Sequence, residues 1–286
     1  MSSDFSNVVT VVDTFVAGRS RLLGDLLNTS VYSLDLPEIV FPWIFFPNTF
    51  PPTRYGSDGH EVRDEESLVP STVNGYRMYA GGRLTLDKSL SDGQRYMKIS
   101  SIDSVVNKEG RSGTLTFIDV IHDVVEEGSG TPLYRDIQNL VYLSSRKSPR
   151  KIVATDGVIL GISCIEATES NCSANFVADA SMLFRYSALT YNGHKIHLDR
   201  EYSRGVESLP GLVVHGPLLA TVGATIANQL RRSGESIVEH NFRLHSTLFE
   251  GESAAFSASR DGSNFSGSAL CDGDLVISFE GKFGSI

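Results

Sequence analysis

Two histidines lie three residues apart in the stretch NGHKIHLD, which runs from Asn192 to Asp199. Histidine titrates near working pH, so His194 and His197 have the chemistry of a general acid and base. Together with Asp199 they could instead bind a metal ion, and two surface histidines without a function are a third interpretation. No further ligand follows at a spacing typical of zinc sites, so we expect no metal and no cofactor.

The elements that must position this loop are predicted from periodicity. After Pro217, apolar side chains recur every four residues up to Leu230, which predicts a helix. Residues 5–27 are predicted to form an amphipathic helix, and the proline-rich segment 37–56 an apolar loop. Alternating segments bounded by turn residues predict strands at 83–87, 96–106, 114–125, 137–143, 240–249, 253–262, 265–273 and 274–283, with a connection at 144–176.

Composition excludes several classes of protein. The net charge of −9 argues against a nucleic-acid binder, and 41% hydrophobic residues allow a sizeable core. Three cysteines without a CxxC pair indicate a reducing compartment. The sequence contains no apolar run of about 18 residues, so it predicts no membrane span. The first residues lack the features of a targeting segment. We therefore expect a cytoplasmic protein.

Two long blocks of the sequence resemble a known family. Residues 76–124 (YRMYAGGRLTLD…FIDVIHDV) and 183–222 (LFRYSALTYNGHKIHLD…VVHGPLLATV) resemble the MaoC-like acyl-thioester hydratases and dehydratases, in particular the branch of mesaconyl-CoA hydratases and type 2 hydroxyacyl-thioester dehydratases. The resemblance implies an α+β fold of the double hotdog type, in which each of two antiparallel sheets wraps a central helix. It divides the chain into a pocket-shaping hotdog (1–150), a linker (151–177) and a catalytic hotdog (178–286).

The resemblance also implies roles for the loop. Such hydratases carry a motif Asp-x-Asn-Pro-x-His-x-Asp, and here Asn192 falls on the first Asp, His194 on the Asn and His197 on the His. We therefore expect His197 to be the principal acid and base. Asn192 cannot act as a base but can hold water or a hydroxyl group through hydrogen bonds, and His194 is a candidate second proton carrier.

Besides an acid and a base, this chemistry requires donors that stabilise the charge on the thioester oxygen, and the start of the predicted helix could supply them. An N–H group at a helix start has no partner within the helix and lies at the positive end of its dipole. The N–H of Gly216, or a neighbouring one, is therefore a candidate donor to the thioester oxygen. Further candidates for contact with the substrate are Tyr191, Val214, His215, Arg185 and Trp43, with packing or salt bridges as the alternative for the last three.

The resulting hypothesis is a hydro-lyase that adds or removes water at the α,β position of an acyl thioester. CoA is favoured over a carrier protein, because an acidic chain matches an acidic carrier poorly. One alternative is a specialised hotdog dehydratase or cyclase of a polyketide-like biosynthetic pathway. Another is a non-catalytic acyl-binding hotdog protein. A monomer, with its two hotdogs as a pseudo-dimer, and a homodimer both remain open.

Overall fold

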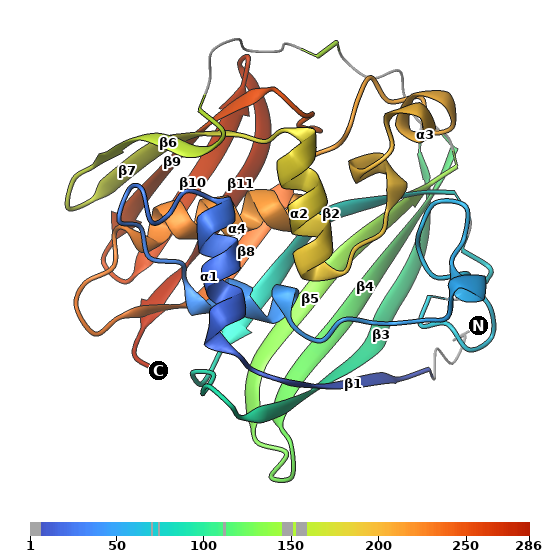
Figure 1. Ribbon diagram of the computed structural model, residues 1–286, viewed down its shortest axis with the longest axis horizontal. Coiled ribbons are helices and arrows are strands. Elements are labelled where there is room, and N and C mark those ends of the chain that lie inside the picture. The colour runs from blue at the N-terminus through green and yellow to red at the C-terminus, as the bar shows by residue number, and fades with distance from the viewer. Residues whose placement is uncertain (1–6, 70, 74, 111–112, 145–150, 153–158) are drawn as a thin grey trace.

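The computed structural model describes residues 7–69, 71–73, 75–110, 113–144, 151–152 and 159–286, and within them the strands form one antiparallel sheet. Its order is β1-β3-β4-β5-β2-β8-β11-β10-β9-β7-β6, eleven strands in all (Figure 1). The strands are β1 Val9–Thr14, β2 Tyr76–Leu86, β3 Arg95–Gly110, β4 Gly113–Glu126, β5 Pro132–Leu143, β6 Gly161–Ala167, β7 Asn171–Val177, β8 Ser236–Leu244, β9 Ser253–Asp261, β10 Asn264–Cys271 and β11 Asp274–Gly284.

Four α-helices and three short 3₁₀ helices accompany the sheet in the described part of the chain. They are α1 Ala17–Leu26, α2 Ala180–Thr190, α3 Arg200–Gly205, α4 Gly216–Asn228, η1 Glu38–Ile44, η2 Pro52–Arg54 and η3 Lys195–His197. None of these helices combines the length and the apolar character needed to cross a membrane.

The two halves of the sheet meet where β2 pairs with β8, and a pair of glycines makes this junction possible. Gly82 lies opposite Phe242 in the register. A Cβ atom on Gly81 would lie 2.4 Å from the Phe242 carbonyl oxygen, and one on Gly82 would lie 2.8 Å from the Ile137 carbonyl oxygen. Side chains at these positions would push the neighbouring strands away, so the glycines let one sheet run through both halves.

Helix α4 fills the concave side of the C-terminal half (Figure 1). It packs against β7 to β11, and every residue from Leu218 to Asn228 is buried. A helix that is apolar all round must lie in the core. Gly223 lets it approach closely, because a Cβ atom there would lie 3.0 Å from the Phe279 ring.

In the N-terminal half, the short helix η1 and the residues after it lie over β3 and β5. The indole Nε1–H of Trp43 donates a hydrogen bond to Asp136 Oδ2 on β5 (2.9 Å), and Lys98 on β3 donates one to the Phe46 carbonyl oxygen (2.9 Å). Proline at position 42 inside η1 limits its length. A short element covers less of the sheet than α4 does, and a cavity opens on this side.

Most of the strands predicted from the periodicity, and the helix predicted after Pro217, are confirmed. The helix predicted over residues 5–27 is wrong in its first half. Residues Val9–Thr14 form β1, which pairs with β3, and only Ala17–Leu26 are helical. The segment VTVVDT is rich in β-branched residues that alternate between half-buried and exposed positions. Such residues favour a strand once a partner strand is available.

The connection predicted over residues 144–176 is also corrected. Strands β6 and β7 form there and extend the sheet, with β7 paired to β9. Alternation from Asn171 to Val177 was masked by serine and asparagine, which are typical of loops. Part of the expected linker, residues 153–158, lies outside the described residues, and the division into 1–150, 151–177 and 178–286 stays a prediction.

Candidate active site

The loop NGHKIHLD begins where α2 ends. Tyr191 ends the helix in a left-handed conformation (φ 54°) and its N–H donates to the Ser187 carbonyl oxygen. The side chain of Asn192 then accepts a hydrogen bond from the His194 N–H (3.0 Å), which closes a turn typical of asparagine. The other end of the loop is fixed by Asp199, which caps α3 by accepting the Tyr202 N–H (3.0 Å).

Four histidine rings lie in a row at this end of the cavity. The ring centroids of His60 and His194 are 4.3 Å apart, those of His194 and His197 are 5.5 Å apart, and those of His197 and His215 are 3.6 Å apart. His194, His197 and His215 are buried, with 5%, 7% and 1% of their surface exposed. These are therefore not surface histidines. Burial favours the neutral form of His197 and His215.

The hydrogen bonds of His197 define which ring nitrogen can accept a proton. Nδ1 lies 2.7 Å from the Val213 carbonyl oxygen. A carbonyl oxygen only accepts hydrogen bonds, so Nδ1 carries the proton and Nε2 offers a lone pair. Burial lowers the pKa of His197 to about 4, partly offset by this hydrogen bond. The ring is thus a neutral acceptor at neutral pH.

His60 comes from the N-terminal half and has the opposite arrangement. Its Nδ1 lies 3.4 Å from Nη1 of Arg77 on β2. A guanidinium group only donates, so Nδ1 accepts and the proton is on Nε2, which has no partner among the described residues. Burial, and then the charge of Arg77, hold the pKa of His60 well below its ordinary value. The ring is a neutral donor.

Backbone contacts hold His60 against the loop NGHKIHLD. The Lys195 N–H donates to the Asp58 carbonyl oxygen (2.9 Å). Gly59 has a left-handed φ of +87°, and a Cβ atom on it would lie 2.0 Å from the Gly193 carbonyl oxygen. Only glycine permits such a close approach of two backbones. The sequence carried no motif for His60, although glycine beside histidine in a turn was a usable signal.

The start of α4 lies beside these rings. The ring of His215, which precedes Gly216, stacks on His197, and its Nε2 lies 2.9 Å from Ser187 Oγ. A Cβ atom on Gly216 would lie 2.5 Å from Leu244 Cδ1 and 3.4 Å from Tyr79. Glycine therefore lets the helix start pack at the cavity wall, where the first N–H groups of α4 have no partner within the helix.

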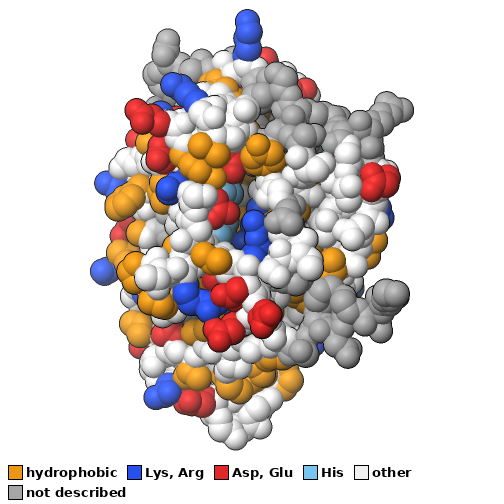
Figure 2. Space-filling view, turned by 90° about the vertical axis from the view of Figure 1, so that its right-hand side faces the viewer, with side chains coloured by type: hydrophobic (Ala, Val, Ile, Leu, Met, Phe, Trp, Pro, Cys, Tyr) orange, Lys and Arg blue, Asp and Glu red, His pale blue; other side chains and the backbone are white. Residues whose placement is uncertain are grey.

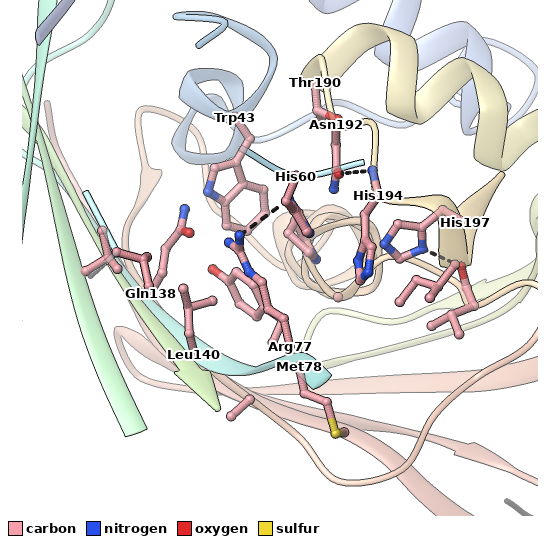
Figure 3. Close-up of a pocket in the computed structure, with 18 of the residues that line it drawn as sticks. Trp43, His60, Arg77, Met78, Gln138, Leu140, Thr190, Asn192, His194 and His197 are labelled. Carbon is pink, nitrogen blue, oxygen red and sulfur yellow. Dashed lines mark hydrogen bonds between the residues drawn. The ribbon is translucent and has the colours of Figure 1, made fainter. Parts of the chain in front are cut away.

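His60, His194 and His197 border a cavity of about 1010 Å³ between the two halves of the molecule. On the face shown in Figure 2 a hollow exposes histidine side chains among acidic and basic ones. In Figure 3, Trp43, His60, Asn192, His194 and His197 surround the same space.

Seven of the nine sequence-predicted site residues border this cavity. They are Trp43, Tyr191, Asn192, His194, His197, Val214 and Gly216. His215 lies behind His197 and does not border the cavity. Arg185 is exposed on α2, outside the residues that border it. The structure thus brings the catalytic candidates together and leaves Arg185 apart.

The described residues contain no group of three or more His, Cys, Asp or Glu side chains that could hold a metal ion. The third ligand considered for such a site, Asp199, caps α3 instead.

The fold is that of MaoC-like dehydratases. A solved MaoC-like dehydratase is similar with a TM-score of 0.66 at 12% identity, over 97% of this chain and 98% of that one. A second, from Phytophthora capsici, has a TM-score of 0.64 at 14% identity, over 98% and 96% of the two chains. Identities this low show the fold alone.

Sequence comparison identifies the family. The model of the hydroxyacyl-thioester dehydratase type 2 family matches residues 41–250, and the chain belongs to this family. The mesaconyl-C(4)-CoA hydratase of Chloroflexus aurantiacus is 32% identical over 208 residues, which are 73% of this chain and 69% of the relative. The mitochondrial hydroxyacyl-thioester dehydratase type 2 of Schizosaccharomyces pombe is 48% identical over 46 residues, 16% of this chain and 15% of the relative.

Membership of this family confirms the resemblance read from the two sequence blocks. It also confirms that the chain is an enzyme of the hydratase and dehydratase type, a lyase. The α+β fold with a large antiparallel sheet around helix α4 agrees with the MaoC-like neighbours.

Proposed function

We propose that the protein adds water to, or removes it from, the α,β position of an acyl-CoA thioester. The observation that carries this proposal is the buried His197, whose Nε2 offers a lone pair beside the start of α4 in a cavity large enough for an acyl chain. Support comes from the family and from the relative named mesaconyl-C(4)-CoA hydratase.

His197 is the proposed base of the reaction. In the dehydration direction its Nε2 takes the proton from the α carbon, and the electron pair moves onto the thioester carbonyl oxygen. The β hydroxyl then takes that proton from Nε2 of His197 and leaves as water, while the electron pair returns from the thioester oxygen and forms the double bond between the α and β carbons. In hydration the same steps run backwards. A positioned histidine contributes about 100- to 10,000-fold to such proton transfers.

His60 is the proposed hydrogen-bond donor that complements His197. Because Nε2–H of His60 has no partner among the described residues, it can donate to the β oxygen or to the water that becomes it. This role was expected of His194, whose ring stands between the two. We assign His194 to the wall that keeps the two rings apart, and Asn192 to closing the loop turn.

The N–H groups of Gly216 and Leu218 are the proposed donors to the developing oxyanion. Pro217 has no N–H, and the Leu219 N–H already donates to the His215 carbonyl oxygen (3.1 Å). The helix dipole adds to their effect at this end of α4.

We further infer that the sheet and α4 belong to a double hotdog. The junction of β2 with β8 joins two antiparallel halves side by side, and α4 takes the place of a central helix in the second. In the first, η1 stands where a long helix would otherwise lie, which leaves the cavity open for the acyl group.

Hydration of a panel of trans-2-enoyl-CoAs, including crotonyl-CoA and mesaconyl-CoA, tests the function. The wild-type protein should hydrate at least one, and His197→Ala should lower kcat by about 100-fold or more. Thermal unfolding and circular dichroism must show that the variant is folded. Full activity of a folded His197→Ala variant would refute the mechanism. A wild-type protein that hydrates no member of the panel would contradict the proposed function itself.

A further inference from the structure

The cavity has a second polar region, on the face of β3, β4 and β5 that borders it. Alternate side chains of β5 point to this face, among them Tyr134, Asp136 and Gln138. His122 on β4 lies opposite Asp136 in the register, and Lys98 comes from β3. These residues form what we call the polar wall.

Several polar atoms of this wall have no hydrogen-bond partner among the described residues. Asp136 is buried, and its Oδ2 accepts from Trp43 Nε1 (2.9 Å) and from Gln138 Nε2 (2.7 Å), while Oδ1 has no partner. The hydroxyl groups of Tyr79 and Tyr134 are buried without a partner as well. Buried polar groups normally find partners, so these atoms indicate a missing one.

Lys98 is a buried cation in the same wall as the buried carboxylate of Asp136, but it forms no ion pair with it. Lys98 donates to the Phe46 carbonyl oxygen (2.9 Å), and none of the ion pairs within the described residues links it to Asp136. Burial lowers the pKa of Lys98 to about 8 and raises the pKa of Asp136 to about 6, so both groups are charged at pH 7. Burial also lowers the pKa of His122 to about 3, which keeps that ring neutral. The wall therefore has no net charge.

The chemistry of these atoms selects a group that both donates and accepts. Oδ1 of Asp136 requires a donor, whereas the Lys98 ammonium and the Tyr134 hydroxyl can donate. A hydrocarbon chain would leave Oδ1 of Asp136 and the Tyr134 hydroxyl unpaired and is disfavoured. A carboxylate would face the charge of Asp136 and would satisfy no acceptor. A hydroxyl group gives its hydrogen to Asp136 and accepts from a neighbouring donor.

We propose that the acyl group taken by this enzyme carries a hydroxyl group on its distal part, and that Asp136, Tyr134 and Lys98 bind it. This inference rests on the proposed function, because it names the class of substrate. The distal hydroxyl is separate from the one that the reaction adds or removes. In Figure 3, Trp43 and Gln138 of this region lie across the pocket from His194 and His197.

Matched pairs of trans-2-enoyl-CoAs test the proposal. Each pair, from hexenoyl to dodecenoyl, consists of the plain compound and the same chain with a terminal hydroxyl group. For at least one chain length the hydroxylated member should have a kcat/KM about tenfold higher or more, the worth of one or two hydrogen bonds. Crotonyl-CoA, which is too short to carry a distal group, reports the reaction itself.

Two conservative variants separate the polar wall from general packing. Tyr134→Phe removes an unpaired hydroxyl, so it should reduce the ratio of kcat/KM for the hydroxylated chain to that for the plain chain several-fold. Tyr96→Phe is the matched control, because Tyr96 is a buried tyrosine of β3 whose hydroxyl accepts from the Ser91 N–H (2.8 Å) outside the residues that border the cavity. It should keep the preference.

A binding measurement makes the inference independent of turnover. By isothermal titration calorimetry, wild-type protein should bind a saturated terminally hydroxylated acyl-CoA about tenfold more tightly than the plain acyl-CoA of equal length. Equal affinities and equal kcat/KM values across all pairs would overturn the inference. They would indicate that water alone pairs with the atoms of the polar wall. A preference for terminal carboxylates would overturn it too. Hydroxyl-selective binding without hydration of any enoyl-CoA would instead refute the proposed function and uphold the inference.

Discussion

At the scale of single residues, the proposed catalytic end of the cavity pairs two neutral histidines with opposite hydrogen-bonding capacity. Val213 fixes the proton of His197 on Nδ1, and Arg77 fixes that of His60 on Nε2. One ring can accept where the other donates, so proton transfer needs no charged side chain in the resting site. This arrangement offers a way to work without the aspartate that Asn192 replaces.

Substitution of His60 tests this pairing. His60→Ala should lower kcat by about 100-fold or more, because the donor to the β oxygen is lost. His60→Gln keeps an N–H donor near the Nε2 position and should retain more activity than His60→Ala, with KM little changed in both. Steady-state kinetics on the best enoyl-CoA measures kcat and KM separately for each variant. Equal activity of wild type and His60→Ala would remove His60 from the mechanism.

The Asn192 side chain allows a second residue-scale prediction. Asn192→Asp keeps an oxygen for the His194 N–H, so the loop turn should survive and the free energy of unfolding should stay close to that of the wild type. Asn192→Ala loses this hydrogen bond and should lower the free energy of unfolding by about 1 kcal/mol. Urea unfolding of the three proteins makes the comparison. A strongly destabilised Asn192→Asp variant would contradict the structural role given to this side chain.

At the scale of elements, the site depends on the docking of the turn at Gly59 against the loop after α2. These two segments are far apart in the sequence and belong to different halves of the chain. The hydrogen bond from Lys195 to Asp58 and the close approach of Gly59 to Gly193 join them. The proposed donor and base therefore keep their distance only while this contact holds.

Gly59→Ala tests the contact. The new methyl group would collide with the Gly193 carbonyl oxygen, so kcat should fall by about tenfold or more even though no catalytic side chain changes. Gly93→Ala is a matched control, because Gly93 also has a left-handed φ (+78°) but nothing within 4 Å of the added Cβ. It carries the same kind of backbone strain without the collision, and its kcat should equal that of the wild type. Equal kcat values for both variants would contradict the docking argument.

At the scale of the whole molecule, buried histidines make stability depend on pH. Burial lowers the pKa to about 4 for His197 and His240 and to about 3 for His122, and lowers it well below the ordinary value for His60 and His215. Between about pH 6.5 and pH 4 the unfolded chain therefore binds more protons than the folded one. The free energy of unfolding must fall as the pH falls through this window.

Each such histidine contributes up to about 1.4 kcal/mol per pH unit, so urea unfolding should show a steep loss of stability between neutral pH and about pH 5. Asp136, whose pKa burial raises to about 6, acts in the opposite direction, and so do Glu38 and Glu61, whose pKa values burial also raises, but the histidines outnumber these carboxyl groups. Replacing His240, which packs among Phe242, Phe265 and Phe279 outside the site, by phenylalanine should make the slope shallower. An unchanged slope in His240→Phe would contradict the prediction.

Sequence patterns predicted those parts that depend on short-range order. The four-residue apolar repeat after Pro217 fixed α4, and alternation fixed most strands, because these patterns follow from the geometry of one element alone. The loop NGHKIHLD and Gly216 could be assigned because they lie within one continuous block. The strands β1, β6 and β7 were missed, since their residues become strands only through pairing with β3 and β9.

The amino-acid sequence by itself determined the family, the helix α4 and His197 with its loop. Only the tertiary structure decided that His60 lies against that loop, that Arg185 lies outside the cavity, and that Asp136 belongs to the polar wall. The physical reason is that a site between two halves of a sheet is made by contacts across the chain. Backbone docking, ring tautomers and unpaired buried atoms depend on those contacts, and spacing along the sequence does not encode them.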